Sequence, residues 1–144
     1  MSSNGKCGER LFKSIMESRN YKVIDVSDNP EYWEKDIDFI ITSSTSGLTK
    51  TFEVKWDSKI NRTGNLYLET DNINSKGGKG WYQFCQADYL AYADAATRTF
   101  YIIPLLELKK KVNKLCCRSA SCDNGGSMGL LVSLKDISDI VEIL

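Results

Sequence analysis

The chain has 144 residues, of which 42% are hydrophobic and 26% are charged, a composition typical of one compact globular domain spanning residues 1–144. Its 19 basic and 19 acidic residues cancel, so the net charge neither supports nor excludes a nucleic-acid partner, which would recognise a local cationic face. The sequence contains no histidine, which excludes Ser-His-Asp catalysis, Cys-His catalysis and His-ligated zinc. Any catalysis must therefore use carboxylates, Lys, Tyr or Cys.

The sequence indicates a cytoplasmic protein. No apolar run approaches the roughly 18–20 residues that a membrane span needs, and residues 1–6 are polar, unlike the apolar core of a secretion signal. The five cysteines are an odd number, which argues against a disulfide framework. Free thiols are therefore favoured over a metal or cluster site for Cys7, Cys116, Cys117 and Cys122.

The first half of the chain predicts one helix followed by four strands. Residues 7–19 carry apolar side chains at helical spacing. A strand over 21–26 ends at the turn signal of 28–30. The following expected elements are strands over 36–42, 50–56 and 66–69, with a polar loop over 43–49.

The second half predicts a flexible stretch over 71–80 and a helix over 81–96. After these we expect a strand over 99–103, a basic helix over 105–115, a small-residue loop over 119–129, and short elements at 130–132, 135–137 and 140–144. The order helix, four strands, helix, strand predicts a layered α/β or α+β architecture.

The strand over 50–56 places two charged side chains together. Phe52, Val54 and Trp56 alternate with Glu53 and Lys55, so the charged pair lies on the opposite sheet face from the apolar residues. A hairpin loop centred near Ser46 brings Asp38 opposite the stretch 53–55, with Asp36 about two residues farther along. If the register of the hairpin is shifted, Asp36 takes the place of Asp38 as the carboxylate opposite Glu53 and Lys55.

Two converging carboxylates repel each other and attract a cation. A divalent metal with oxygen ligands fits this arrangement, and Mg²⁺ prefers one or two carboxylates together with waters and phosphate oxygens. Such a metal polarises a phosphodiester and activates a water molecule, while a neighbouring Lys orients the water or offsets transition-state charge. The alternative is an ordinary ion pair on an exposed sheet face.

The pattern of Asp38, fourteen residues, then Glu53-Val54-Lys55 resembles the PD-(D/E)XK nuclease superfamily, although Ile37 stands where the name-giving proline would be. The resemblance implies an α/β, restriction-endonuclease-like core (αβββαβ), with a central mixed four- to five-stranded sheet flanked by helices. It also implies a deoxyribonuclease in which Asp38 and Glu53 bind Mg²⁺ or Mn²⁺, the Val54 carbonyl joins them, Lys55 assists the attacking water, and Glu9 supplies the acidic residue of the first helix.

Other residues have less specific interpretations. Phosphate contacts to DNA are expected from Lys59, Arg62, Lys76 and Lys79, with a solvated loop as the alternative. The basic run 109–114 is either a second phosphate contact or a solvated helix face. Glu69 is either a further ligand or an exposed carboxylate. Gln86 and Tyr89 resemble a helix arrangement of RecB-like nucleases, but core packing is favoured.

Partners and rival functions also follow from the sequence. A domain of this size would work as a homodimer or beside partners in a larger nucleic-acid-processing complex. The main alternative function is an inactive nuclease fold that binds nucleic acid or protein without cleaving. A purely structural domain with surface ion pairs is the third.

Overall fold

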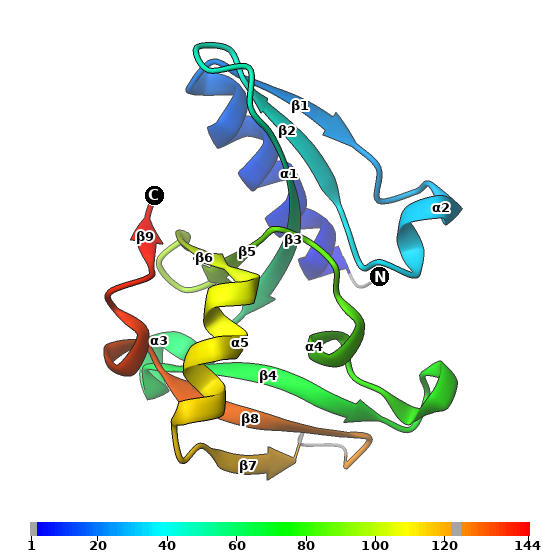
Figure 1. The fold of residues 1–144 in the computed structure, drawn as a ribbon, viewed down its shortest axis with the longest axis vertical. Helices are drawn as coiled ribbons and strands as arrows, with labels where there is room; N and C mark the ends of the chain where they lie inside the picture. Colours follow the sequence, from blue (N-terminus) through cyan, green and yellow to red (C-terminus); the bar gives the residue numbers. More distant parts are fainter. Residues whose placement is uncertain (1–2, 122–124) are drawn as a thin grey trace.

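The computed structural model describes residues 3–121 and 125–144, which form two β-sheets and their covering helices (Figure 1). The larger sheet has the strand order β1-β2-β3-β5-β6-β9, and only the β3–β5 pair is parallel. Its strands are β1 (Tyr21–Asp25), β2 (Phe39–Ser43), β3 (Thr49–Asp57), β5 (Tyr89–Asp94), β6 (Thr99–Pro104) and β9 (Glu142–Ile143). The smaller, antiparallel sheet has the order β4-β8-β7, with β4 (Asn65–Asn72), β8 (Ser127–Ser133) and β7 (Arg118–Ser121).

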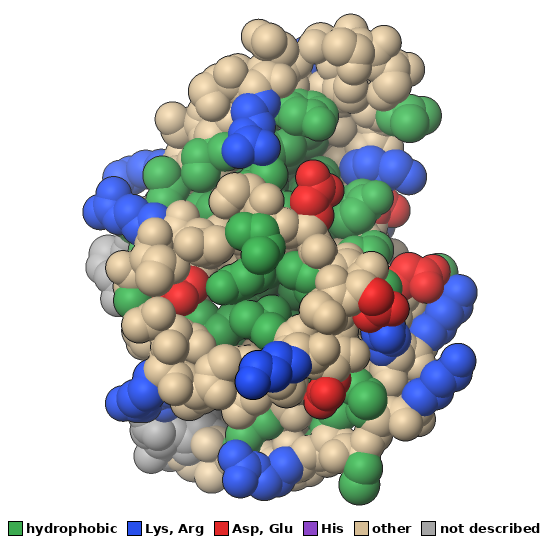
Figure 2. Space-filling view, turned by 90° about the vertical axis from the view of Figure 1, so that its left-hand side faces the viewer, with side chains coloured by type: hydrophobic (Ala, Val, Ile, Leu, Met, Phe, Trp, Pro, Cys, Tyr) green, Lys and Arg blue, Asp and Glu red, His purple; other side chains and the backbone are tan. Residues whose placement is uncertain are grey.

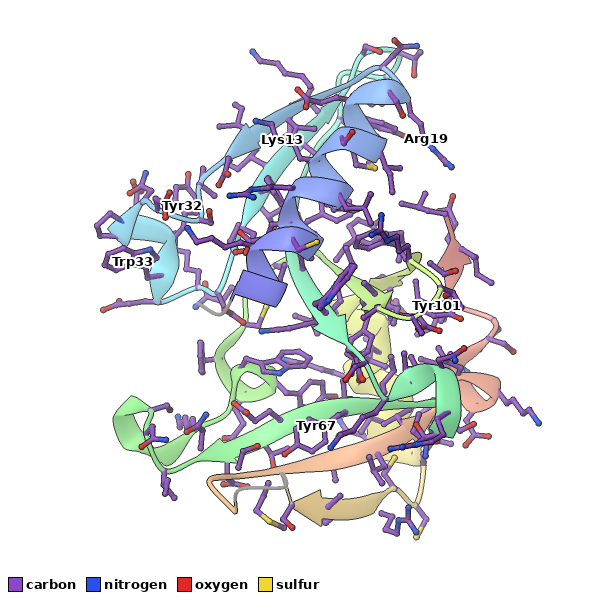
Figure 3. All side chains as sticks on the ribbon, turned by 180° about the vertical axis from the view of Figure 1, so that it is seen from behind. Lys13, Arg19, Tyr32, Trp33, Tyr67 and Tyr101 are labelled. Atoms are coloured by element: carbon purple, nitrogen blue, oxygen red, sulfur yellow. The ribbon has the colours of Figure 1, made fainter. Side chains whose placement is uncertain are left out.

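One long and several short helices connect the strands. The α-helices are α1 (Ser3–Ser18), α2 (Pro30–Trp33), α3 (Ile60–Thr63), α4 (Trp81–Phe84) and α5 (Leu105–Lys114), and the 3-10 turns are η1 (Lys76–Gly78) and η2 (Leu134–Ile137). The short α2 projects at the edge of the molecule, where Trp33 is labelled in Figure 3 and is 60% exposed. Within the described residues, no helix is long and apolar enough to cross a membrane.

The two faces of the large sheet bury separate hydrophobic clusters. On one face, Phe12 of α1 is fully buried, with its ring centroid 5.3–6.0 Å from those of Phe39, Phe52 and Phe100. On the other face, strands of the small sheet and helix α5 contribute Leu66, Leu68, Leu108 and Val132. The sheet is therefore covered on both faces around β5 and the middle of β3, and polar groups there lie in a low-dielectric environment, whereas β1 is largely exposed.

The predicted α/β class, with a mixed sheet flanked by helices, is confirmed. The sheet has six strands rather than four or five because residues 89–94 and 142–143 both join it. The predicted helix over 81–96 is wrong: α4 ends at Phe84 and β5 follows. Residues 90–94 are all buried, and a parallel strand covered on both faces gives a continuous apolar run whose periodicity does not distinguish it from a helix.

The predicted loop over 119–129 is also corrected. Ser119 pairs with Leu130 and Ala120 with Gly129, so β7 and β8 form antiparallel partners on either side of residues 122–124, which lie outside the described part of the chain. The small residues of β7 show no alternation of apolar and polar side chains, because this strand is mostly exposed. Its pairing with β8 depends on the tertiary fold, which the local sequence does not reveal.

Gly80 allows a close approach between α4 and β4. Its N–H donates to the Thr70 carbonyl at 2.9 Å, and a Cβ atom at this position would overlap the Glu69 backbone. A side chain here would force the strand and the short helix apart. Gly80 thus fixes the place of Trp81, the first residue of α4.

Gly80→Ala is expected to lower the free energy of unfolding by about 1–3 kcal/mol, the usual scale of overpacking. Chemical denaturation measures this loss. Gly78→Ala is the matched control, because its Cβ would meet nothing within 4 Å and only its positive φ of 69° opposes the substitution, at a cost of about 1 kcal/mol. Equal stability of wild type and Gly80→Ala would contradict the close-approach interpretation.

Candidate active site

The β2–β3 hairpin places Asp38 beside Glu53. Phe39 pairs with Phe52 in the ladder, and the Asp38 N–H donates to the Phe52 carbonyl at 2.9 Å. The carboxylate turns back toward β3, where its Oδ2 accepts a hydrogen bond from the Val54 N–H at 3.0 Å. The hairpin thus brings together the two carboxylates that the sequence spacing associates.

Lys55 is held on the same face of β3 as Glu53. Its Nζ lies 3.1 Å from Glu53 Oε1 and 3.5 Å from Asp36 Oδ2, and 4.6 Å from the ring centroid of Trp81. Asp36 reaches this position from a left-handed backbone conformation (φ 52°) just before β2. Two carboxylates and an aromatic face therefore position one ammonium group, whose side chain remains 23% exposed.

Burial sets the electrostatics of the carboxylates. Glu53 is 4% exposed and Asp38 is 5% exposed. Burial raises the pKa of Glu53 well above its ordinary value; Lys55 opposes this rise, and Asp36 and Asp38 reinforce it. Burial also raises the pKa of Asp38, although its hydrogen bond with Val54 acts in the opposite direction. Ionising both groups without a further cation is therefore costly.

Lys55 stays protonated despite its partial burial. Burial lowers its pKa, but Glu53 and Asp36 outweigh that effect, so the net pKa lies above the ordinary lysine value. A lysine in this state cannot accept a proton near neutral pH. It can donate hydrogen bonds and offset negative charge.

One oxygen of Glu53 lacks a hydrogen-bond donor. Oε1 is paired with Lys55, but no group in the described part of the chain donates to the buried Oε2. Such orphaned buried oxygens are rare in folded proteins, and an oxygen-seeking cation would satisfy this one. Among the described residues no three Asp, Glu, Cys or His side chains form a ready-made metal site. Two carboxylates alone nevertheless fit Mg²⁺, which keeps several waters.

Glu9 lies on helix α1, near enough to Asp38 for the two carboxyl groups to interact electrostatically. It is 7% exposed, and burial raises its pKa to about 7, with further increases from the charges of Asp38 and Asp25. Beside it lies a cavity of about 250 Å³ whose lining includes Lys6, Arg10 and Lys13. Helical spacing could have identified these three cations, because positions 6, 10 and 13 share one helix face.

The expected phosphate contacts do not form one cluster. Lys59 directly precedes α3 and the exposed Arg62 lies within it, whereas the exposed Lys79 follows η1. Figure 1 shows α3 and η1 at opposite ends of β4. The side chain of Lys76 lies outside the described part of the structure. On the face seen in Figure 2, basic side chains are likewise dispersed rather than gathered in one patch.

Other residues with less specific interpretations lie outside the carboxylate cluster. Tyr89 stacks on Phe52 across the β3–β5 pair with centroids 5.2 Å apart, so it belongs to the core, and Gln86 is exposed outside any helix. Glu69 accepts a hydrogen bond from Asn72 at 3.4 Å. Cys7, Cys116 and Cys117 are free thiols, and Cys122 lies outside the described residues.

The comparisons with known proteins concern the fold. No family model matches the chain, and no curated protein matches it. A solved structure of a bacterial homing endonuclease, I-Ssp6803I, is similar with a TM-score of 0.52 and 14% sequence identity, covering 74% of this chain and 67% of that one. The chain therefore has a nuclease-like α/β fold.

Proposed function

We propose that this protein is a Mg²⁺- or Mn²⁺-dependent nuclease of the PD-(D/E)XK type that hydrolyses phosphodiester bonds of DNA. The observation that carries the proposal is Glu53 Oε2, which is buried beside Asp38, lies next to a protonated Lys55 and receives no hydrogen bond from the described residues. The shared fold with a homing endonuclease agrees with it. A surface ion pair would not bury two carboxylates of raised pKa.

Each residue has a role that its environment suits. Asp38 and Glu53 would hold the metal through carboxylate oxygens, together with the Val54 carbonyl. When bound, Mg²⁺ supplies a Lewis acid that polarises the phosphodiester and acidifies a water molecule. The ammonium of Lys55 orients the attacking water and offsets the charge that develops on the phosphate. Because Lys55 stays protonated, it is not the general base.

Glu9 differs from the other two carboxyl groups. Its pKa of about 7 means that it exchanges a proton with water near neutral pH, which is the property of an effective acid–base group. It lies on α1 rather than on the hairpin, so it approaches Asp38 from a different element. We assign it to a bridging water or to a second metal ion.

Glu53→Gln is expected to lower DNA cleavage at least ~10²-fold, the scale of a catalytic group, while the protein still unfolds cooperatively. The amide preserves shape but removes the charge that would bind the metal. Nicking of supercoiled plasmid with Mg²⁺ or Mn²⁺ measures the loss. Glu107→Gln, which changes an exposed glutamate on α5, is the control and should retain wild-type activity.

Lys55→Met should cause a similar loss of cleavage, because it removes the ammonium group while keeping an unbranched side chain in contact with Trp81. Lys110→Met, on the exposed face of α5, is its control. Full activity of either Glu53→Gln or Lys55→Met would refute the site assignment. Binding of DNA by wild type without any cleavage would instead support an inactive binding module.

Metal binding should depend on pH through the carboxyl groups of Glu9, Asp38 and Glu53. Because their pKa values are raised in the folded state, that state holds more protons than the unfolded chain between about pH 4.5 and 7, and metal-free stability should fall as pH rises through this window. Mg²⁺ must displace the protons. Its stabilising effect should therefore be larger at pH 8 than at pH 6.

Thermal melting with and without Mg²⁺ at both pH values tests this expectation. Glu9→Gln should flatten the metal-free pH dependence because it removes the group with a pKa of about 7. Glu53→Gln should remove the Mg²⁺ effect at both pH values. An Mg²⁺ stabilisation that is equal at pH 6 and pH 8, or that survives in Glu53→Gln, would place the metal elsewhere.

A further inference from the structure

A cavity of about 420 Å³ opens directly beside Lys55. It runs along the end of β3 and past α3 toward the small sheet, so it lies between the two sheets of the molecule. Its lining residues come from seven elements, β3, α3, β4, α4, β5, β7 and β8, and from the loop before α3. This volume is within the range of small-molecule sites.

A polar network centred on the half-buried Asp57 joins several of the elements that line the cavity. The Tyr92 hydroxyl donates to Asp57 Oδ2 and accepts from the Tyr67 N–H at 3.0 Å. The other Asp57 oxygen accepts from the N–H groups of Lys59, at 2.6 Å, and Ile60, at 3.1 Å. Asp57 therefore links β3, β5 and the start of α3 beside the cavity.

The walls combine aromatic surface with polar side chains. The aromatic residues Trp81 of α4 and Tyr67 of β4 line the cavity, and Figure 3 labels Tyr67 on its strand. Asn65, Ser58 and Ser121 contribute amide and hydroxyl groups. Aromatic faces with a few polar groups suit a nucleobase, which has an apolar π-face and hydrogen-bonding edges.

The position of the cavity restricts how a base could enter it. Lys55 belongs both to the cavity wall and to the carboxylate cluster, so an occupant would lie next to the phosphate that faces Lys55 and the metal site of Glu53. Bases of a continuous duplex are stacked inside the helix and cannot reach such a pocket without being unpaired. An already unpaired nucleotide reaches it without that cost.

We propose that this cavity binds the base of an unpaired nucleotide adjacent to the phosphodiester bond that is cut. The inference rests on the proposed nuclease function and specifies its substrate class: DNA with a single-stranded or branched segment at the cleavage position, preferred over continuous duplex. The base stacks against the aromatic wall while the neighbouring phosphate faces Lys55.

The test compares two duplexes that differ in one group. Both carry a single unpaired nucleotide, which has its base in one duplex and is an abasic analogue in the other, so their phosphate charge is equal. Affinities are measured by fluorescence anisotropy without divalent metal. Wild type should bind the base-containing duplex at least about tenfold more tightly, the effect of one stacked base. Equal affinities would overturn the proposal.

Ala120→Phe fills the cavity from β7, a strand that contributes nothing to the carboxylate site. It should abolish the preference for the base while leaving the affinity for the abasic duplex unchanged. Ser119→Phe, at the exposed neighbouring position, is the matched control and should keep the preference. If Ala120→Phe does not fold, Ser121→Phe at the exposed rim takes its place. A preference that survives in the folded filling variant would overturn the proposal.

The binding and cleavage outcomes separate the two proposals. Because the affinity comparison needs no metal, it is read whether or not the protein cleaves. No cleavage of any of these duplexes with Mg²⁺ or Mn²⁺ would refute the nuclease function alone. Efficient cleavage of continuous duplex, together with equal binding of the base and abasic duplexes, would refute the cavity proposal alone.

Discussion

The ion pair between Lys55 and Glu53 organises the site, and it depends on the covered large sheet. Glu53 and Lys55 lie on one face of β3 because strand side chains alternate, while Phe52 and Val54 pack on the other face with α1. The pair joins only one oxygen of Glu53 to the ammonium. The other oxygen lies beside Asp38, and the negative charge of the two carboxylates would be stabilised by a further cation.

The carboxylates need a further cation because both faces of the sheet are covered around them and water cannot solvate their charge. A carboxylate on an exposed sheet would be hydrated and would need no partner. Here α1 covers one face, and α4, α5 and the small sheet cover the other (Figure 1). Burying polar groups without complete pairing costs stability, and proteins retain such costs mainly at functional sites.

The carboxylate pair could be predicted from sequence because its geometry is local. A short hairpin fixes the register, and alternation fixes the face, so Asp38, Glu53 and Lys55 required no tertiary information. Trp81 could not be placed over Lys55 in this way. Its position depends on the contact of Gly80 with β4, which joins segments whose pairing no local pattern encodes.

The features that the sequence did not predict correctly also depend on contacts between distant segments. The segment 89–94 has the apolar content of a buried helix, and only its neighbours β3 and β6 make it a strand. The phosphate contacts expected of Lys59 and Lys79 stay a prediction, although the two residues lie at opposite ends of β4. The cations of α1 and the cavity beside Lys55 were not identified, because both depend on how distant elements pack.

The buried carboxylate pair of Asp38 and Glu53 is proposed to bind a divalent metal. A crystal structure of the protein grown with Mn²⁺ at pH 8 tests it most directly, because Mn²⁺ is located by its anomalous scattering. One anomalous peak is expected beside Glu53 Oε2 and Asp38, at the roughly 2.0–2.2 Å of an oxygen-bound divalent metal. A well-ordered structure at saturating Mn²⁺ with no peak at this pair, and with Glu53 Oε2 still without a partner, would contradict it.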